Sequence, residues 1–112
     1  MSATYKLDGS FVTADPINNP VPIRETLDYD HAGAPIFSPY YRTTLEFPPL
    51  KAAEFAVWYA VCDGAAHSIL MPTIGNQGSY TTYSGVFLVL MGGHYSTGIY
   101  TYDVQIEVRH IS

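Results

Sequence analysis

The chain has 112 residues, a formal net charge of −5 and a charged fraction of only 13%. This length predicts a single domain, residues 1–112, that buries a core without disulfides or metals. The single cysteine, Cys62, excludes an intramolecular disulfide and a four-cysteine zinc module, and the five basic residues are too scattered to predict direct nucleic-acid binding.

The N-terminal residues, Met1–Lys6, lack the apolar run of a signal peptide. No later stretch approaches the roughly 20 apolar residues of a membrane span. We therefore expect neither a secretory leader nor a membrane partner.

Two short apolar segments flank Asp8-Gly9 near the N-terminus. An Asp-Gly pair in this setting predicts a hairpin with a two-residue turn. Residues 14–22 follow, and prolines such as Pro16 and Pro20 exclude a helix or a central strand there. We expect this segment to be an extended arm or a surface loop, and such arms often reach across to a neighbouring subunit.

Residues 23–29 alternate between apolar and polar side chains, which predicts a strand. The following residues, 30–35, predict a turn. Alternation returns at residues 40–47. Pro39 and Pro48 are expected to bracket this second strand, because proline cannot donate to a strand ladder.

The hydrophobic period changes at residues 49–62. Leu50, Val57 and Val61 recur at helical spacing, proline is tolerated in the first turn, and Gly64 can end the helix. We expect a single α-helix here, about residues 49–62, with its apolar face packed on the sheet.

A strand is predicted at residues 67–73, followed by a mobile polar loop at residues 74–80. Residues 81–111 then predict a long antiparallel pair at the centre of the domain. Val86–Met91 is apolar on both faces, which predicts a strand covered on both sides. The connection Gly92–Gly98 is long for a hairpin, and exposed loops of this kind often contact partners.

The second half of this pair alternates regularly, which predicts a half-buried strand. The residues expected on its apolar face are Tyr100, Tyr102, Val104, Ile106 and Val108. Together these segments predict a mainly β fold, an antiparallel β-sandwich or roll with a single α-helix packed on the sheet.

Candidate catalytic and metal-binding groups lack the spacing that their chemistry requires. Asp103 and Glu107 would lie roughly 13 Å apart on one strand face, whereas glycosidase carboxylates are about 5–9.5 Å apart. Cys62 is interpreted as a small core residue rather than a nucleophile. We expect no enzyme activity and no cofactor. No metal site is expected either, since no His-x-His spacing occurs among His31, His67, His94 and His110.

Tyrosine occurs ten times. It combines a large contact area with a hydroxyl group and is enriched at protein interfaces, which suits a protein packed against neighbours. It is also a good strand residue, so its abundance has a second explanation in the fold alone.

Two stretches resemble a pattern in virion proteins of tailed bacteriophages. They are Tyr41-Arg42-Thr43-Thr44-Leu45-Glu46-Phe47-Pro48-Pro49-Leu50-Lys51-Ala52-Ala53-Glu54-Phe55 and Ser68-Ile69-Leu70-Met71-Pro72. Those proteins, found in tail tubes, tail-end adaptors and baseplates, often have a strand with an arginine, a helix with a Leu-x-x-x-Glu start and a strand ending in Leu-x-Pro. The resemblance implies a small β-sandwich or roll with one packed helix and no catalytic residues.

On this resemblance we expect a non-enzymatic structural subunit of a bacteriophage tail, baseplate or connector, made in the host cytoplasm and located in the virion. Its partners would be copies of itself and other virion proteins. The alternatives are a capsid decoration protein and a carbohydrate-binding module that stacks exposed Tyr80, Tyr83 and Tyr95 on sugar rings. The interface is expected in residues 14–22, 74–80 and 92–98, with candidate residues Pro16, Ile17, Pro20, Tyr80, Tyr83, His94 and Tyr95.

Overall fold

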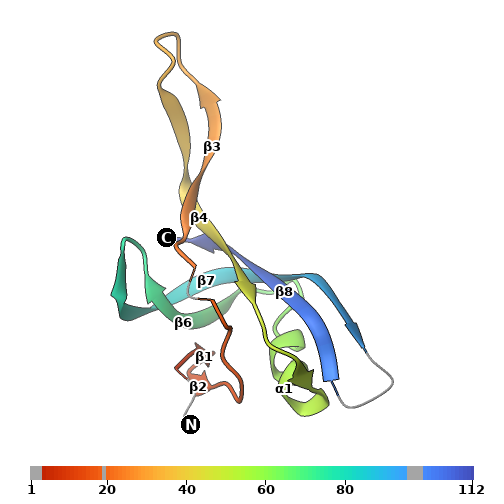
Figure 1. The fold of residues 1–112 in the computed structure, drawn as a ribbon. Helices are drawn as coiled ribbons and strands as arrows, with labels where there is room; N and C mark the ends of the chain where they lie inside the picture. The colour runs from red at the N-terminus through yellow and green to blue at the C-terminus, as the bar shows by residue number, and fades with distance from the viewer. Residues whose placement is uncertain (1–3, 19, 96–99) are drawn as a thin grey trace.

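The structure is a computed structural model that describes residues 4–18, 20–95 and 100–112. Within these residues the strands are antiparallel, in the order β2-β1-β6-β7-β8-β4-β3, with β5 paired to β8. This confirms the predicted antiparallel sandwich or roll with one helix (Figure 1). The elements are β1 (Lys6–Leu7), β2 (Ser10–Phe11), β3 (Ile23–Tyr29), β4 (Pro35–Glu46), β5 (Leu50–Lys51), α1 (Ala52–Tyr59), β6 (His67–Thr73), β7 (Asn76–Tyr95) and β8 (Tyr100–Ile111).

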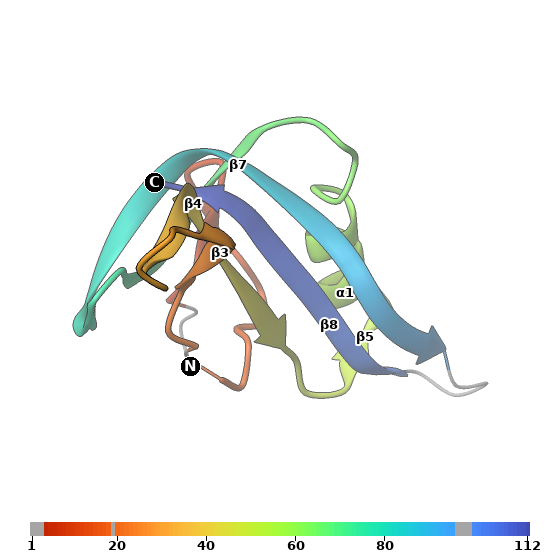
Figure 2. The same ribbon diagram turned by 90° about the horizontal axis from the view of Figure 1, so that it is seen from above.

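Strand β7 joins the two halves of the fold. Its first part, up to Val86, pairs with β6, and its second part, from Phe87 onward, pairs with β8. Between Tyr83 and Val86 it carries one residue more than β6 does, so the strand contains a β-bulge. Gly85 lies in this bulge with φ +71°, a conformation that strains any residue with a Cβ. The bulge coincides with the bend of β7 seen in Figure 2.

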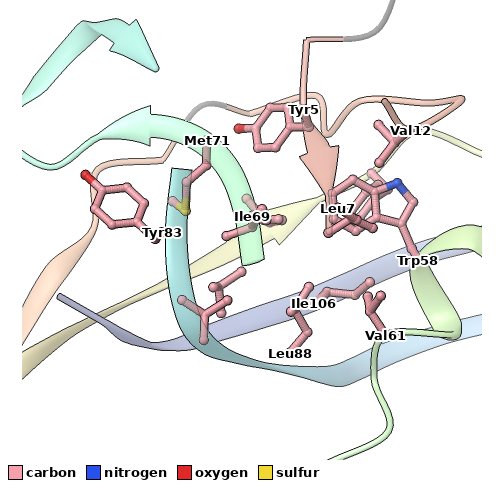
Figure 3. Close-up of a cluster of buried hydrophobic side chains, with 14 of the residues drawn as sticks. Tyr5, Leu7, Val12, Trp58, Val61, Ile69, Met71, Tyr83, Leu88 and Ile106 are labelled. Atoms are coloured by element: carbon pink, nitrogen blue, oxygen red, sulfur yellow. The ribbon is translucent and has the colours of Figure 1, made fainter. Parts of the chain in front are cut away.

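The core lies inside this bend, where α1 and the N-terminal segment pack against it. Trp58 of α1 is fully buried, and its ring meets Phe47 at 4.8 Å and Tyr5 at 6.2 Å between centroids, both edge to face. The indole Nε1–H donates to the Ala14 carbonyl at 2.9 Å, so its one polar group is satisfied. Figure 3 shows Trp58 beside Leu7 and Val61, in the same cluster as Ile69, Leu88 and Ile106.

The helix is confirmed but is shorter than the predicted 49–62. Leu50 and Lys51 are extended and pair with β8 as β5, so the helix begins only at Ala52. The Lys51 backbone N–H donates to the Glu54 carboxylate at 2.9 Å, which satisfies one of the free donors at the helix start. In the described part of the chain, no helix has the length and apolar character needed to span a membrane.

The Asp8-Gly9 hairpin is confirmed. Both turn residues have positive φ, +50° and +86°, as a two-residue turn of this kind requires. By contrast, the polar loop predicted at 74–80 is wrong. Thr73 pairs with Asn76, so β6 and β7 are joined by a tight turn at Ile74-Gly75 and the rest of the segment is strand.

Two other predicted faces need correction. Val86–Met91 is not covered on both sides, because Val89 and Met91 are 38% and 52% exposed. In β8, Val104, Ile106 and Val108 are buried as predicted, but Thr101 is buried while Tyr102 is only half-buried. The cause is a bulge around Asp103, which has φ +56° and shifts the alternation by one residue.

The hairpin formed by β3 and the first half of β4 projects from this body (Figure 1). It accounts for the elongated shape, with principal extents of 55 × 27 × 25 Å. The radius of gyration is 15.3 Å, whereas a compact chain of this length would have about 13 Å.

Gly85→Ala should lower the free energy of unfolding by about 1–2 kcal/mol, because a Cβ at φ +71° is strained even though the surrounding space is open. Gly78→Ala in the same strand is the matched control, since Gly78 has no positive φ, and it should change stability by less than about 0.5 kcal/mol. Urea unfolding measures both. Equal effects of the two substitutions would contradict the role given to Gly85.

Candidate assembly surface

The projecting hairpin carries large apolar side chains that the monomer leaves largely exposed. Six of them are between 39% and 65% exposed. Burial of apolar surface contributes about 25 cal/mol per Å² of favourable free energy. A partner that covered this ribbon would therefore be stabilised on it by apolar burial. We call this the hairpin surface, and it consists of Ile23, Leu27, Tyr29, Ile36, Phe37 and Tyr40.

The hairpin is attached to the body only at its base. β4 pairs with β8 from Tyr41 to Glu46, whereas residues 35–37 of β4 pair only with β3 within the described residues. β3 is the last strand of the sheet, so its outer edge is open there. Two-stranded ribbons are marginally stable alone in water, and open edges are ready templates for another strand.

The tip of the hairpin is well defined. Asp30 accepts hydrogen bonds at its Oδ1 from the backbone N–H groups of Ala32 and Ala34, both at 2.9 Å. The turn predicted at 30–35 is therefore confirmed for residues 30–34. The predicted boundary at Pro39 is wrong, since β4 begins at Pro35. Pro39 lies where β4 has extra residues relative to β3, and a residue without an N–H is tolerated at such an irregularity.

The segment 14–22 is a surface loop bound to the body rather than a free arm. The side chain of Asn18 makes the two kinds of hydrogen bond that a neighbouring strand would make to β4. Its amide N–H donates to the Thr44 carbonyl at 3.1 Å, and its Oδ1 accepts from the Glu46 N–H at 2.8 Å. Ile17 N–H also donates to the Glu46 carbonyl, at 2.8 Å. These bonds cover the edge of β4 beyond the end of β3.

The seven candidate interface residues lie in different places. In the loop 14–22, Pro16 is buried, Pro20 is half-buried and Ile17 is 67% exposed. The prediction that Tyr83 is exposed is wrong, because the residue is only 8% exposed and its hydroxyl accepts the Ile74 N–H at 2.8 Å.

The remaining candidate interface residues do not lie together on one surface. Tyr80 is 37% exposed and its ring packs edge-on against Tyr5, 6.0 Å away. His94 and Tyr95 are exposed at the other end of β7, where His94 stacks on Tyr102. The three tyrosines expected to stack on sugar rings are therefore not coplanar neighbours on an open face. Residues 96–98 of the predicted loop 92–98 lie outside the described residues.

One histidine is enclosed by two carboxylates. His67 Nδ1 lies 2.7 Å from Asp8 Oδ2, and its Nε2 lies 2.8 Å from Asp63 Oδ1. Hydrogen bonding to Asp63, and then to Asp8, raises the pKa of His67 above its usual 6.5. Because both ring nitrogens donate, this imidazolium joins the β1–β2 turn to the segment before β6 and has no free nitrogen for proton abstraction.

Two further groups considered from the sequence are also engaged. Burial raises the pKa of the half-buried Cys62 thiol to about 11, which disfavours the nucleophilic thiolate. Glu107 is buried, and its carboxylate accepts a hydrogen bond from Arg109 Nε. In the described residues, no three potential ligands from histidine, cysteine, aspartate or glutamate converge on a metal site.

The basic residues are less scattered in space than in sequence. Arg42 and Arg109 line one polar hollow of about 240 Å³ together with His110, at the base of the hairpin. Arg24 lies over the neighbouring Tyr41 ring, 4.7 Å from its centroid. These basic side chains lie beside the bulges in β4 and β8. The sequence pattern did not indicate the bulges, so it did not predict that the basic residues would lie together.

Sequence reasoning missed the hairpin surface because it treated Pro35–Pro39 as a break before a strand. The available signal was Ile36-Phe37, an apolar pair between two prolines that no predicted core position used. Comparisons with protein-family models, with curated proteins and with solved structures found no match to this chain.

The His67 cluster should make stability depend on pH. The raised pKa of His67 makes its contribution complete below pH 6.5 and lost as the pH rises through the folded value. Hydrogen bonds lower the pKa values of Asp8 and Asp63 below 3.8, so their contribution is present above pH 3.8 and lost as the pH falls through the folded values. The cluster therefore stabilises most between about pH 4 and 6.5.

His67→Gln measures this effect, because glutamine keeps hydrogen-bonding groups without the charge. The difference in unfolding free energy between the natural protein and this variant should be largest near pH 5–6 and should shrink toward pH 9. His31→Gln, on the exposed hairpin turn, is the control and should show no such trend. A difference for His67→Gln that is constant with pH would contradict the assignment.

Proposed function

We propose that this chain is a non-enzymatic structural subunit that works by assembling with copies of itself, as part of a bacteriophage tail, baseplate or connector. The observation that carries the proposal is the hairpin surface. A projecting ribbon with six exposed large apolar side chains is stable when a partner covers it, and it is costly to leave in water.

The low charge of the chain supports the same proposal. With 13% charged residues, the surface has few groups that would oppose close packing of subunits. The open edge of β3 adds backbone donors and acceptors to the apolar side chains of the hairpin. Pairing of strand edges supplies direction and register, and apolar burial supplies free energy.

The titratable groups favour a structural role over catalysis. His67 is held between two carboxylates and the Cys62 thiol is shifted away from its reactive form. A general base or nucleophile needs a free nitrogen or a lowered pKa in a cleft.

The placement in a bacteriophage particle rests on the resemblance of residues 41–55 and 68–72 to tailed-phage virion proteins. The β-sandwich or roll with one packed helix is the fold that this resemblance implies. Position in the tail, in contrast to a capsid decoration protein, rests on that resemblance alone.

The proposal is tested by light scattering across a concentration series. The natural protein should show a mass several times its 12.3 kDa, and Ile36→Thr with Phe37→Thr should shift assembly to at least tenfold higher concentration. Both residues are exposed, so the variant should fold. Phe11→Thr, 61% exposed on β2, is the matched control and should assemble normally.

A monomer at every concentration would oppose self-assembly through the hairpin and would favour the carbohydrate-binding alternative. A glycan array would then be the next measurement. Electron microscopy of assembled samples distinguishes rings or tubes, which a tail or connector subunit should form, from irregular aggregates.

A further inference from the structure

A second unsatisfied strand edge lies on the other side of the molecule. β6 covers β7 only as far as Val86, so residues 87–94 pair with β8 on one side alone within the described residues. In an antiparallel strand, about every second residue points its N–H and C=O away from the paired neighbour. This edge of β7 therefore presents backbone hydrogen-bonding groups that no described strand uses.

An apolar groove runs along this edge, between α1 and β7. One part has a volume of about 670 Å³, with Tyr59 and Cys62 on one side and Phe87 and Val89 on the other. A second part of about 250 Å³ contains Phe55. The two parts share Leu90, and Phe55 stacks on Tyr59 at 5.4 Å. We call this continuous feature the α1–β7 groove.

A helix beside an open strand edge is an arrangement that accepts an added strand. The edge supplies main-chain hydrogen bonds, and the apolar walls supply contacts for alternate side chains. The open edge 87–94 is about 26 Å long, and β3, with seven residues, is about 23 Å. The groove thus matches an edge strand of the length that this chain itself exposes.

We propose that the α1–β7 groove binds the β3–β4 hairpin of a second copy of this chain, with β3 added to the edge of β7. The inference deepens the proposed function, on which it rests, by naming the surface that receives the hairpin. The hairpin points away from α1, so it does not fill the groove of its own copy (Figure 1).

Charge complementarity supports this occupant and sets its direction. Asp28 and Asp30 lie near the hairpin tip, and Arg109 and His110 line the groove at the end marked by Phe87. Placing the tip at that end runs β3 antiparallel to β7, the direction of the other pairs in this sheet. Arg109 uses its Nε to bind Glu107, and the rest of its guanidinium is available to a neighbouring carboxylate.

The inference is tested with two single substitutions and their mixture. Leu27→Glu alters the hairpin and keeps the groove, whereas Val89→Glu alters the groove and keeps the hairpin. These side chains are 64% and 38% exposed, so the fold should be retained, as unfolding midpoints would verify. Each variant alone should need at least tenfold higher concentration to assemble, because a charge meets an apolar surface.

The equimolar mixture of the two variants should form a 1:1 complex, since one copy supplies an intact hairpin and the other an intact groove. Tyr59→Glu, on the opposite wall and 54% exposed, is a second groove variant in case Val89→Glu unfolds. Phe11→Glu is the control outside both surfaces and should assemble normally.

Other outcomes overturn the inference in distinguishable ways. If the groove variants assemble normally while Leu27→Glu does not, the hairpin binds elsewhere; the proposed function then stands and this inference falls. A mixture that stays monomeric also overturns the inference. Normal assembly of Leu27→Glu, or a natural protein that remains monomeric, overturns both.

Discussion

The structure depends on one strand, β7, which pairs with two different strands along its length. β7 pairs first with β6 and then with β8, and it can do so around one core only because it bends at the bulge that contains Gly85. The bend brings Ile69 and Met71 of β6 to the same core as Ile106 of β8. The bend also ends the pairing of β7 with β6. The same feature that encloses the core therefore leaves the edge of β7 beyond Val86 without a partner strand among the described residues.

Much of the fold could be predicted from the sequence because local rules determine it. Asp8-Gly9 predicted a tight hairpin, the period change near Leu50 predicted the helix, and alternation predicted β3, the second half of β4 and the second half of β8. Two of the errors share one cause, since bulges change the alternation without leaving a pattern. The shift at Asp103 and the extra residues around Pro39 follow from the register of pairing with the neighbouring strand, which the period of one strand does not contain.

The candidate surface was harder to predict than the fold. Prolines marked the segment 14–22 as irregular, but composition alone did not show that Asn18 would bond to β4. Ile36 and Phe37 have the character of core residues, and only the position of β8 leaves them outside the core. A partner surface of this kind has the same composition as a core. It can be recognised only when the structure shows which apolar residues form the monomer's own core.

The hairpin projects from one end of a molecule 55 Å long, whereas the groove belongs to its body, and this gives an assembly built from their contact a polarity. Every open row of subunits would end in a bare ribbon on one side and an empty groove on the other. These two ends have different chemistry, so one terminating protein could not serve both. A row would stop growing only by closing on itself or by meeting two distinct caps, one shaped like a strand and one shaped like a cleft.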